Sequence, residues 1–293
     1  MKYAWIREHA MAFPVAVMCD VVEVSPSGYY AWCDRKPSAR AQRRQQLGDA
    51  VEQAHRDSKN IYGYRKVHRE VVEEHGQPCS EETVRTLMRA KGLRGKRKRG
   101  FVTTTDSRHA LPVAPNILDR HFEPDQPNQT WVGDITYIPT CEGWLYLAAV
   151  MDLCGRRIVG WSTSAHIDTQ LVSDALHRAL RCRKTEAGLL FHSDRGVQYA
   201  SHSFQSLLGL FGITCSMSRK GNCWDNACME RFFGSLKSEW IEDTIYPDRK
   251  TATTAIFEYI ELFYNTKRRH AALDYKTPIQ YEAQVLARGK KAA

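Results

Sequence analysis

Three acidic side chains stand at positions where packing alone would not place them. Asp134 lies inside a segment rich in β-branched and aromatic residues, where charged side chains are depleted. Asp194 ends a short apolar run, and Glu230 lies near the start of an amphipathic helical pattern. Each alone has an ordinary explanation: a strand-edge charge, a turn-forming aspartate and a solvated helix residue. Their chemistry becomes specific only if the fold brings them together.

A cluster of three carboxylates offers only hard oxygen ligands. Such a donor set suits Mg²⁺ or Mn²⁺, which also accept water and phosphate oxygens. Two such ions about 3.5–4 Å apart can activate the attacking oxygen and stabilise the leaving oxygen in phosphoryl transfer. We therefore expect Asp134, Asp194 and Glu230 to be both the catalytic residues and the metal ligands, with two ions per active site.

The elements that must position these acids are predicted from hydrophobic periodicity. Helical spacing is seen over 171–180 and 204–211, and again in the segment that contains Glu230. Five strands are expected at 131–140, 144–151, 157–162, 189–192 and 213–217. The pattern predicts an α/β fold in which a mixed five-stranded sheet is flanked by helices. Two strand ends and one helix can then bring the three carboxylates to one rim.

Two further aspartates lie near the predicted site but have simpler explanations. Asp152 follows the second strand and precedes the Cys154-Gly155 turn, so a turn role is expected. Asp225 lies five residues before Glu230, where the N-cap of the helix belongs.

Composition limits the class of protein. With 43% hydrophobic and 26% charged residues, the chain is expected to fold as a soluble globular protein of two or three units. Its longest apolar run, Trp144–Met151, is too short to span a membrane, and the first twenty residues do not form a signal peptide. The nine cysteines follow no repeated spacing and are expected to be reduced thiols. We expect a cytoplasmic protein with no membrane partner.

The net charge of +9 is concentrated in one stretch. Residues 35–109 carry 19 basic and 9 acidic side chains, whereas the remaining segments are nearly balanced. Such a block neutralises phosphates and releases counterions, which favours a nucleic-acid partner. A solvated, highly charged helical surface is the alternative interpretation of the charge by itself.

The pattern inside this block predicts a helix-turn-helix. A first helix over 65–74 is broken near Gly76, and Ser80 can cap a second helix that ends at Gly92. On the second helix Arg85 and Arg89 lie four residues apart and can face a DNA groove. A basic arm of Lys96, Arg97, Lys98 and Arg99 follows and is expected to bind phosphate.

The chain divides into five predicted parts. Residues 1–45 form an N-terminal helical segment, and 46–110 form the helix-turn-helix DNA-binding domain. A proline-punctuated linker covers 111–128. The catalytic core spans 129–245, and 246–293 form a C-terminal helical extension of that core, which includes a helix over 257–264.

Dispersed motifs give a specific family resemblance. The segments Trp131–Tyr137, His192–Tyr199 and Ser216–Asn226, the last running into Glu230, resemble the second-reading-frame (OrfB) transposase of the insertion-sequence-three (IS-three) family. The segment Tyr264–Leu273 with Thr277-Pro278 matches the C-terminal signature of that family. Two upstream segments, Ser27–Trp32 and Tyr62–Lys66, match as well. The core is also similar to that of retroviral integrases.

This resemblance implies a ribonuclease-H-like fold with a DDE triad at Asp134, Asp194 and Glu230, and DNA cleavage and strand transfer at insertion-sequence ends. It implies DNA-binding roles for Arg65, Lys66, Lys237, Arg268 and Arg269 in addition to the residues above. The expected partners are the terminal inverted repeats of the element, target DNA, further copies of the chain, and the first-frame protein or a fusion with it. The expected location is the bacterial nucleoid.

Two other functions remain open on the residues alone. A DNA-binding regulator with an inactive core would also keep the helix-turn-helix, but the intact triad disfavours it. A ribonuclease-H or Holliday-type nuclease would also use three carboxylates, but such enzymes rarely need a separate basic domain.

Overall fold

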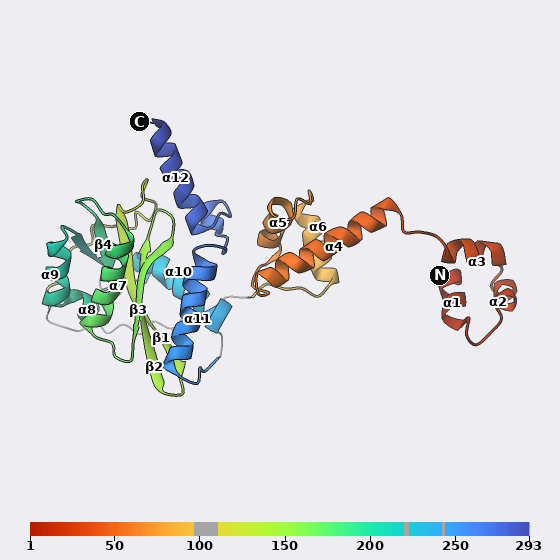
Figure 1. The fold of residues 1–293 in the computed structure, drawn as a ribbon, viewed down its shortest axis with the longest axis horizontal. Coiled ribbons are helices and arrows are strands. Elements are labelled where there is room, and N and C mark those ends of the chain that lie inside the picture. Colours follow the sequence, from red (N-terminus) through yellow and green to blue (C-terminus); the bar gives the residue numbers. More distant parts are fainter. Residues whose placement is uncertain (97–110, 220–222, 242–243, 293) are drawn as a thin grey trace.

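A computed structural model describes residues 1–96, 111–219, 223–241 and 244–292 (Figure 1). The expected arm residues Arg97, Lys98 and Arg99 lie outside this set. Within the described residues, no helix is long and apolar enough to cross a membrane.

Three short helices form the N-terminal unit: α1 (Lys2–His9), α2 (Val15–Val21) and α3 (Pro26–Cys33). They pack around their own small core, which contains Ile6, Met18 and Tyr29. Helix α3 begins at Ser25, whose hydroxyl accepts a hydrogen bond from the amide of Gly28. In Figure 1 this unit stands apart from the remainder of the chain, joined to the next helix by the non-helical residues 34–38.

The helix-turn-helix is confirmed. Helix α4 (Ala39–Asp57) packs against α5 (Tyr64–Glu73) and α6 (Glu81–Ala90), and Val67, Val71, Val84 and Leu87 are buried between them. Its turn follows the expected chemistry, since Gly76 has φ +59° and Ser80 caps α6 by accepting from the amide of Thr83. The expected boundary at 45/46 falls inside α4, so the helical unit begins at Ala39 instead.

The expected mixed five-stranded sheet is also confirmed. Its strands are β1 (Thr130–Thr140), β2 (Gly143–Asp152), β3 (Arg157–Ser164), β4 (Leu190–Ser193) and β5 (Thr214–Met217), in the spatial order β3-β2-β1-β4-β5. The first three strands are antiparallel neighbours, whereas β1, β4 and β5 are parallel. This is the ribonuclease-H-like arrangement that the motifs implied.

Helices cover both faces of the sheet (Figure 1). On one face α7 (Thr169–Cys182), α8 (Val197–Ala200) and α9 (His202–Leu210) pack on a core that contains Trp131 and Phe191. On the other face lie α10 (Ala227–Leu236) and α11 (Arg249–Phe257), with Val132 and Phe232 in the core. Trp131 and Val132 point to opposite faces because successive strand side chains alternate.

Tighter and wider helical turns extend these elements. A short 3₁₀ turn, η1 (Cys223–Asn226), precedes α10, and a π-helical segment, η2 (Lys237–Ile241), follows it. The helix expected over 257–264 is the π-helical η3 (Glu258–Tyr264), which continues α11. After η4 (Ala271–Leu273) the chain ends in α12 (Pro278–Ala292).

The segment expected as a linker, 111–128, is packed against the core rather than extended away from it. Leu118 is buried, and the backbone amides of Ile117 and Leu118 both donate to the hydroxyl of Ser216 on β5. The segment therefore forms a strap along the β5 edge of the sheet.

The helix-turn-helix unit contacts the core through a buried arginine. Arg269 is 4% exposed, and its guanidinium forms salt bridges with Glu70 and Glu73 of α5. The hydroxyl of Tyr62 donates to the carbonyl of Lys267 and accepts from the amide of Arg269. Charge pairing and hydrogen bonds thus join the two units.

Close packing of β3 on α7 gives the first testable prediction. A Cβ at Gly160 would lie 2.3 Å from the carbonyl oxygen of Ala175 and 2.6 Å from the amide nitrogen of Ala179, both of which are backbone atoms. We expect Gly160→Ala to lower the free energy of unfolding by about 1–3 kcal/mol, the usual cost of overpacking. Urea denaturation of the full chain measures this change.

The matched control is Gly209→Ala on α9, where a new Cβ meets no atom within 4 Å. Since alanine favours helix over glycine, this change should be neutral or stabilising by up to about 1 kcal/mol. Equal effects of the two substitutions would contradict the close β3–α7 contact.

Candidate functional site

Strand pairing places two of the three acids at the same edge of the sheet. Val132 on β1 is the register partner of His192 on β4, and the two strands are parallel. Asp134 and Asp194 each follow two residues after this pair. They therefore lie side by side where β4 ends, and both side chains are partly exposed.

The third acid comes from α10. Glu230 lies in the first turn of this helix and is partly exposed. The side-chain amide of Asn226, the N-cap residue, donates to the carbonyl oxygen of Gly133 at 3.5 Å. This contact joins the start of the helix to the residue immediately before Asp134.

The three carboxylates interact electrostatically. Burial raises the pKa of Asp134 well above its ordinary value, and the charges of Asp194 and Glu230 raise it further. Burial also raises the pKa of Glu230. The amide of Ile135, which donates to the Asp134 carboxylate, and the charge of Lys237 act in the opposite direction and lower the pKa of Asp134. The carboxylate of Asp194 accepts from the amide of Gly196.

One cation lies beside the acids. Burial lowers the pKa of Lys237, while the charge of Asp134 raises it. The ammonium nitrogen lies 4.5 Å from the centre of the Tyr137 ring. Lys237 thus lies within the electrostatic field of the carboxylates, at the first residue of the π-helical segment η2.

The donor set fits a divalent cation chemically. Three partly exposed carboxylates, of which Asp194 and Glu230 raise the pKa of Asp134, would be stabilised by a hard positive charge. In the described residues, however, no three Asp, Glu, His or Cys side chains stand at the spacing of a formed metal centre. The three residues are therefore suited to a divalent metal ion by their oxygen donors and by their closeness in the fold.

Sequence reasoning missed a tyrosine beneath the acids. Tyr199 is buried, and burial together with the charges of Asp134 and Asp194 raises its pKa. A Cβ at Gly133 would lie 3.3 Å from its hydroxyl and 2.6 Å from the Phe191 ring. Glycine before Asp134 therefore lets β1 lie against these two rings, a signal that the Gly133-Asp134 pair carries in the sequence.

A buried histidine on β4 was missed as well. Both ring nitrogens of His192 are hydrogen-bonded, to the hydroxyls of Ser216 and Ser218. Burial lowers its pKa to about 4. His192 ties β4 to β5 two residues before Asp194.

The N-cap role expected for Asp225 is wrong. Asn226 is the N-cap of α10, whereas Asp225 is 1% exposed and accepts hydrogen bonds from Arg219, Arg120 and Asn116. The Arg219 side chain, ahead of the other contacts, holds the pKa of Asp225 far below its ordinary value. This carboxylate therefore joins the strap and the segment after β5 to the start of α10.

The turn role expected for Asp152 is confirmed. Its carboxylate accepts from the amides of Asn128 and Cys154, and it is 1% exposed. Asp152 therefore joins the end of the strap to the turn after β2.

The expected DNA-binding residues of the helical unit lie on its surface. Arg65, Arg85 and Arg89 are exposed, and Lys66 is half-buried. Arg85 forms a two-pronged contact with Glu82. Lys96 donates from its ammonium group to the carbonyl of Glu239, so it bridges the helical unit and the core.

The two C-terminal arginines are placed differently from the expectation. Arg268 and Arg269 are 7% and 4% exposed. Arg268 forms a salt bridge with Glu239, and Arg269 pairs with glutamates of α5. Because their charges are already matched by buried or half-buried carboxylates, these guanidinium groups join parts of the fold instead of forming an exposed phosphate-binding surface.

This sheet topology, with one acid inside β1, a second directly after the parallel strand β4 and a helix-turn-helix joined to the sheet, defines a DNA-processing enzyme of the integrase-core class. Family models agree: an integrase core domain matches residues 124–223, a second integrase core domain matches 211–278, and an HTH-like domain matches 42–101.

Known relatives identify the family. The chain is 42% identical over 289 residues to the transposase InsF for insertion sequence IS3A of Escherichia coli (strain K12), which covers 98% of this chain and 100% of the relative. It is also 42% identical over 264 residues, 90% of this chain and 97% of the relative, to the uncharacterized 31 kDa protein of insertion element IS600 from Shigella sonnei. The chain belongs to the IS3 family of transposases, and it is a DNA transposase of the DDE-type polynucleotidyl transferases.

Among solved structures, the comparison includes the HTLV-2 integrase catalytic core domain in complex with magnesium. That match has a TM-score of 0.42 and 18% sequence identity, and it covers 54% of this chain and 97% of that chain.

The Asp225 network gives the second prediction. Asp225→Asn keeps the shape of the side chain but removes the charge that holds two arginines and a backbone amide. We expect the free energy of unfolding to fall by about 1.5–3 kcal/mol, the value of hydrogen bonds to a charged group. Urea denaturation followed by tryptophan fluorescence measures this.

Asp168→Asn is the control for this change. Asp168 is exposed and caps α7 by accepting from the amide of Leu171. Because asparagine caps helices as well as aspartate does, this variant should stay within about 0.5 kcal/mol of the original chain. A similarly small effect at Asp225 would show that the network does not need the charge.

Proposed function

We propose that this chain cleaves DNA at the ends of an insertion sequence and joins the freed strand to target DNA, with Asp134, Asp194 and Glu230 as the catalytic triad. The observation that supports this most strongly is the parallel pairing of β1 with β4, which brings Asp134 beside Asp194, together with the charges of Asp194 and of Glu230 on α10, which raise the pKa of Asp134. Among the described residues, no other group of neighbouring acidic side chains is both partly exposed and contained in the segments that resemble the family.

The proposed reaction is phosphoryl transfer. Water attacks the phosphodiester in the cleavage step, and a 3′-hydroxyl attacks in the joining step; one P–O bond forms as another breaks, and the attacking oxygen loses its proton. The triad would hold two Mg²⁺ or Mn²⁺ ions, which supply positive charge for the attacking and leaving oxygens. Positioning of the reactants and neutralisation of their charge therefore account for the rate acceleration.

The residues around the triad have supporting roles in this proposal. Lys237 offers a positive charge beside Asp134, suited to a phosphate of the bound strand. Tyr199 and Phe191 form the floor against which Gly133 lies, so that the backbone before Asp134 is held in place. The Asp225 network fixes the start of α10 and hence the position of Glu230.

We assign DNA binding to the helix-turn-helix, with α6 as the recognition helix. Arg85 and Arg89 lie one turn apart on its exposed side, opposite the buried Val84, Leu87 and Met88. The salt bridge between Arg85 and Glu82 is exposed and contributes little to the stability of the fold. A DNA phosphate or base can therefore replace Glu82 as the partner of Arg85. The base sequence of the terminal repeats would be recognised by α6, while other basic side chains of the helix-turn-helix bind phosphates of the DNA backbone.

The wider setting follows from the proposed reaction. Joining two element ends to one target requires more than one copy of the chain on DNA, and a first-frame protein or a fusion with it is a further expected partner. As a bacterial enzyme that acts on the chromosome, it would work in the cytoplasm at the nucleoid.

Substitution of the triad tests the catalytic assignment. We expect Asp134→Asn, Asp194→Asn and Glu230→Gln each to lower strand transfer at least about 10²–10³-fold, because each removes one negative charge from the carboxylates that would hold the metal ions at the reacting oxygens. DNA affinity should remain near that of the unchanged chain. The assay follows the joining of labelled element ends to a plasmid in the presence of Mg²⁺.

Glu186→Gln is the matched control for the triad variants, since Glu186 is exposed in the loop before β4. This variant should retain full activity. Substantial strand transfer by any one of the three triad variants would remove that residue from the catalytic site, and binding without any metal-dependent cleavage by the unchanged chain would favour a DNA-binding regulator.

Recognition by α6 is tested by a double substitution. Arg85→Ala with Arg89→Ala should reduce the discrimination between terminal-repeat DNA and scrambled DNA by about 1–3 kcal/mol, the range for one bidentate contact to a base. Affinities for both DNAs are measured by fluorescence anisotropy at one salt concentration.

Arg40→Ala with Arg44→Ala is the matched control, because these exposed arginines lie one turn apart on α4. This pair should weaken binding to both DNAs equally, as loss of phosphate contacts does. If the α6 double variant also weakens binding to both DNAs equally, Arg85 and Arg89 bind phosphate, and the terminal repeat is recognised by another part of the chain.

A further inference from the structure

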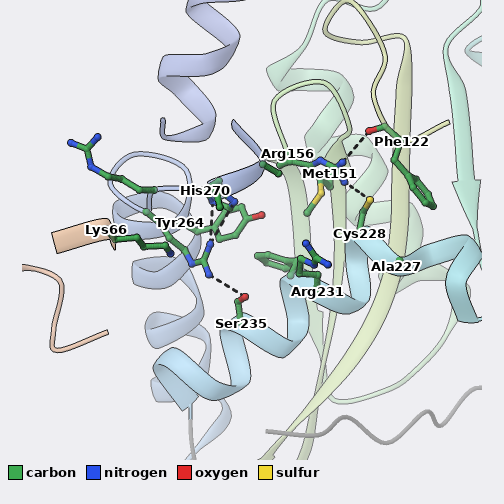
Figure 2. A pocket seen from close by; sticks show the side chains of 15 residues that line it. Lys66, Phe122, Met151, Arg156, Ala227, Cys228, Arg231, Ser235, Tyr264 and His270 are labelled. Carbon is green, nitrogen blue, oxygen red and sulfur yellow. Dashed lines mark hydrogen bonds between the residues drawn. The ribbon is translucent and has the colours of Figure 1, made fainter. Parts of the chain in front are cut away.

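A cavity of about 360 Å³ lies between α5, α10 and the segment 264–272 (Figure 2). It does not lie over the triad but on a neighbouring face of the catalytic helix. Six basic side chains line it, namely Lys66, Arg156, Arg231, Arg268, Arg269 and His270, and none of the described lining residues is acidic.

Two of these cations are already neutralised. Arg268 is paired with Glu239, and Arg269 is paired with Glu70 and Glu73 on its far side from the cavity, where a second hollow is lined by Glu70 and Glu74. Arg268 and Arg269 therefore line the cavity without offering it an unmatched charge. The charge available to a ligand must therefore come from the other basic residues.

Arg156 and Arg231 supply that charge. The guanidinium of Arg156 donates to the sulfur of Cys228 and to the carbonyl oxygen of Phe122, which are uncharged acceptors. Arg231 is exposed, and within the described residues neither arginine forms a salt bridge. Figure 2 shows both side chains beside α10, with Lys66 approaching from α5.

The chemistry of the cavity favours phosphate over a base. Of the phenyl and phenol rings that line it, those of Phe232 and Tyr264 are only 1% and 3% exposed, and Phe122 is half-buried, so none presents a fully open face on which a base could stack. Guanidinium groups match the oxygens of phosphate in a two-pronged geometry. A negatively charged, oxygen-rich group is the ligand that these walls accept.

The position of Arg231 connects the cavity with the proposed reaction. It follows Glu230 directly on α10, so the two Cα atoms are about 3.8 Å apart and their side chains lie on adjacent faces of the helix. A DNA strand held at the triad would therefore pass close to the mouth of the cavity. The helical unit that carries Lys66 forms the opposite wall.

We propose that this cavity binds a backbone phosphate of the DNA strand that passes the triad, through Arg231 and Arg156. The inference rests on the proposed function insofar as the ligand is DNA. The site would fix the strand at a point between the catalytic helix and the helix-turn-helix, independently of base sequence.

The test is the salt dependence of DNA binding by the full chain, measured without divalent metal on a short duplex of random sequence. Each phosphate contact contributes a slope of about 0.9 in the logarithm of affinity against the logarithm of salt concentration. Arg231→Gln and the double variant with Arg156→Gln should lower the slope by about one such contact, with weaker binding at low salt.

Two controls separate charge from folding. Arg181→Gln changes an exposed arginine on α7, on the other face of the sheet, and should leave the slope unchanged. Arg156→Lys in the Arg231→Gln background keeps the charge but loses the two-pronged geometry of the guanidinium, so it should retain more of the slope than the double variant with Arg156→Gln. Since Arg231 is exposed, its substitution leaves the fold intact, and thermal unfolding checks this.

Titration with inorganic pyrophosphate distinguishes the sources of phosphate. If pyrophosphate binds the unchanged chain through Arg231 while the DNA slope of Arg231→Gln equals that of the unchanged chain, the cavity takes a small anion and the proposal fails. Equal slopes for all variants without pyrophosphate binding also overturn it. Because no metal or cleavage enters this assay, its outcome is independent of the triad assignment.

Discussion

Like-charged carboxylates must be held together against their own repulsion, and the architecture of the core depends on this constraint. Burial and the charges of Asp194 and Glu230 all favour the protonated form of Asp134. The acids remain neighbours because each is fixed by its own element: two by the parallel pairing of β1 and β4, and one by α10. The packing of the sheet and helices supplies the free energy that the carboxylates themselves oppose.

The position of α10 is the most demanding part of this arrangement, because a helix can slide or rotate on a sheet where a paired strand cannot. Asp225 and Asn226 tie its start to the strap and to Gly133. Further along, Phe232 packs against Tyr259 and Tyr264 of the π-helical segment η3. Helix α10 is thus fixed at its start by charge-assisted hydrogen bonds and along its middle by aromatic packing.

The same helix connects the catalytic core with the DNA-binding unit. Glu239, two residues into the π-helical continuation of α10, pairs with Arg268, and its carbonyl oxygen accepts from Lys96. Arg269 pairs in turn with α5. Residues that resemble a basic DNA-binding motif in the sequence therefore serve to join the units, whereas Arg231 beside them is exposed.

The sequence by itself determined the class of fold, the helix-turn-helix and the family, because these depend on local periodicity, capping residues such as Ser80, and motifs that are contiguous along the chain. It also singled out the three acids as one group. The tertiary structure decided matters that depend on distant partners. Whether Arg269 is exposed depends on glutamates almost 200 residues away in the chain, and the role of Asp225 depends on Arg120. Charge pairing over such separations leaves no local pattern, so burial of a charged residue could be learned only from the folded chain.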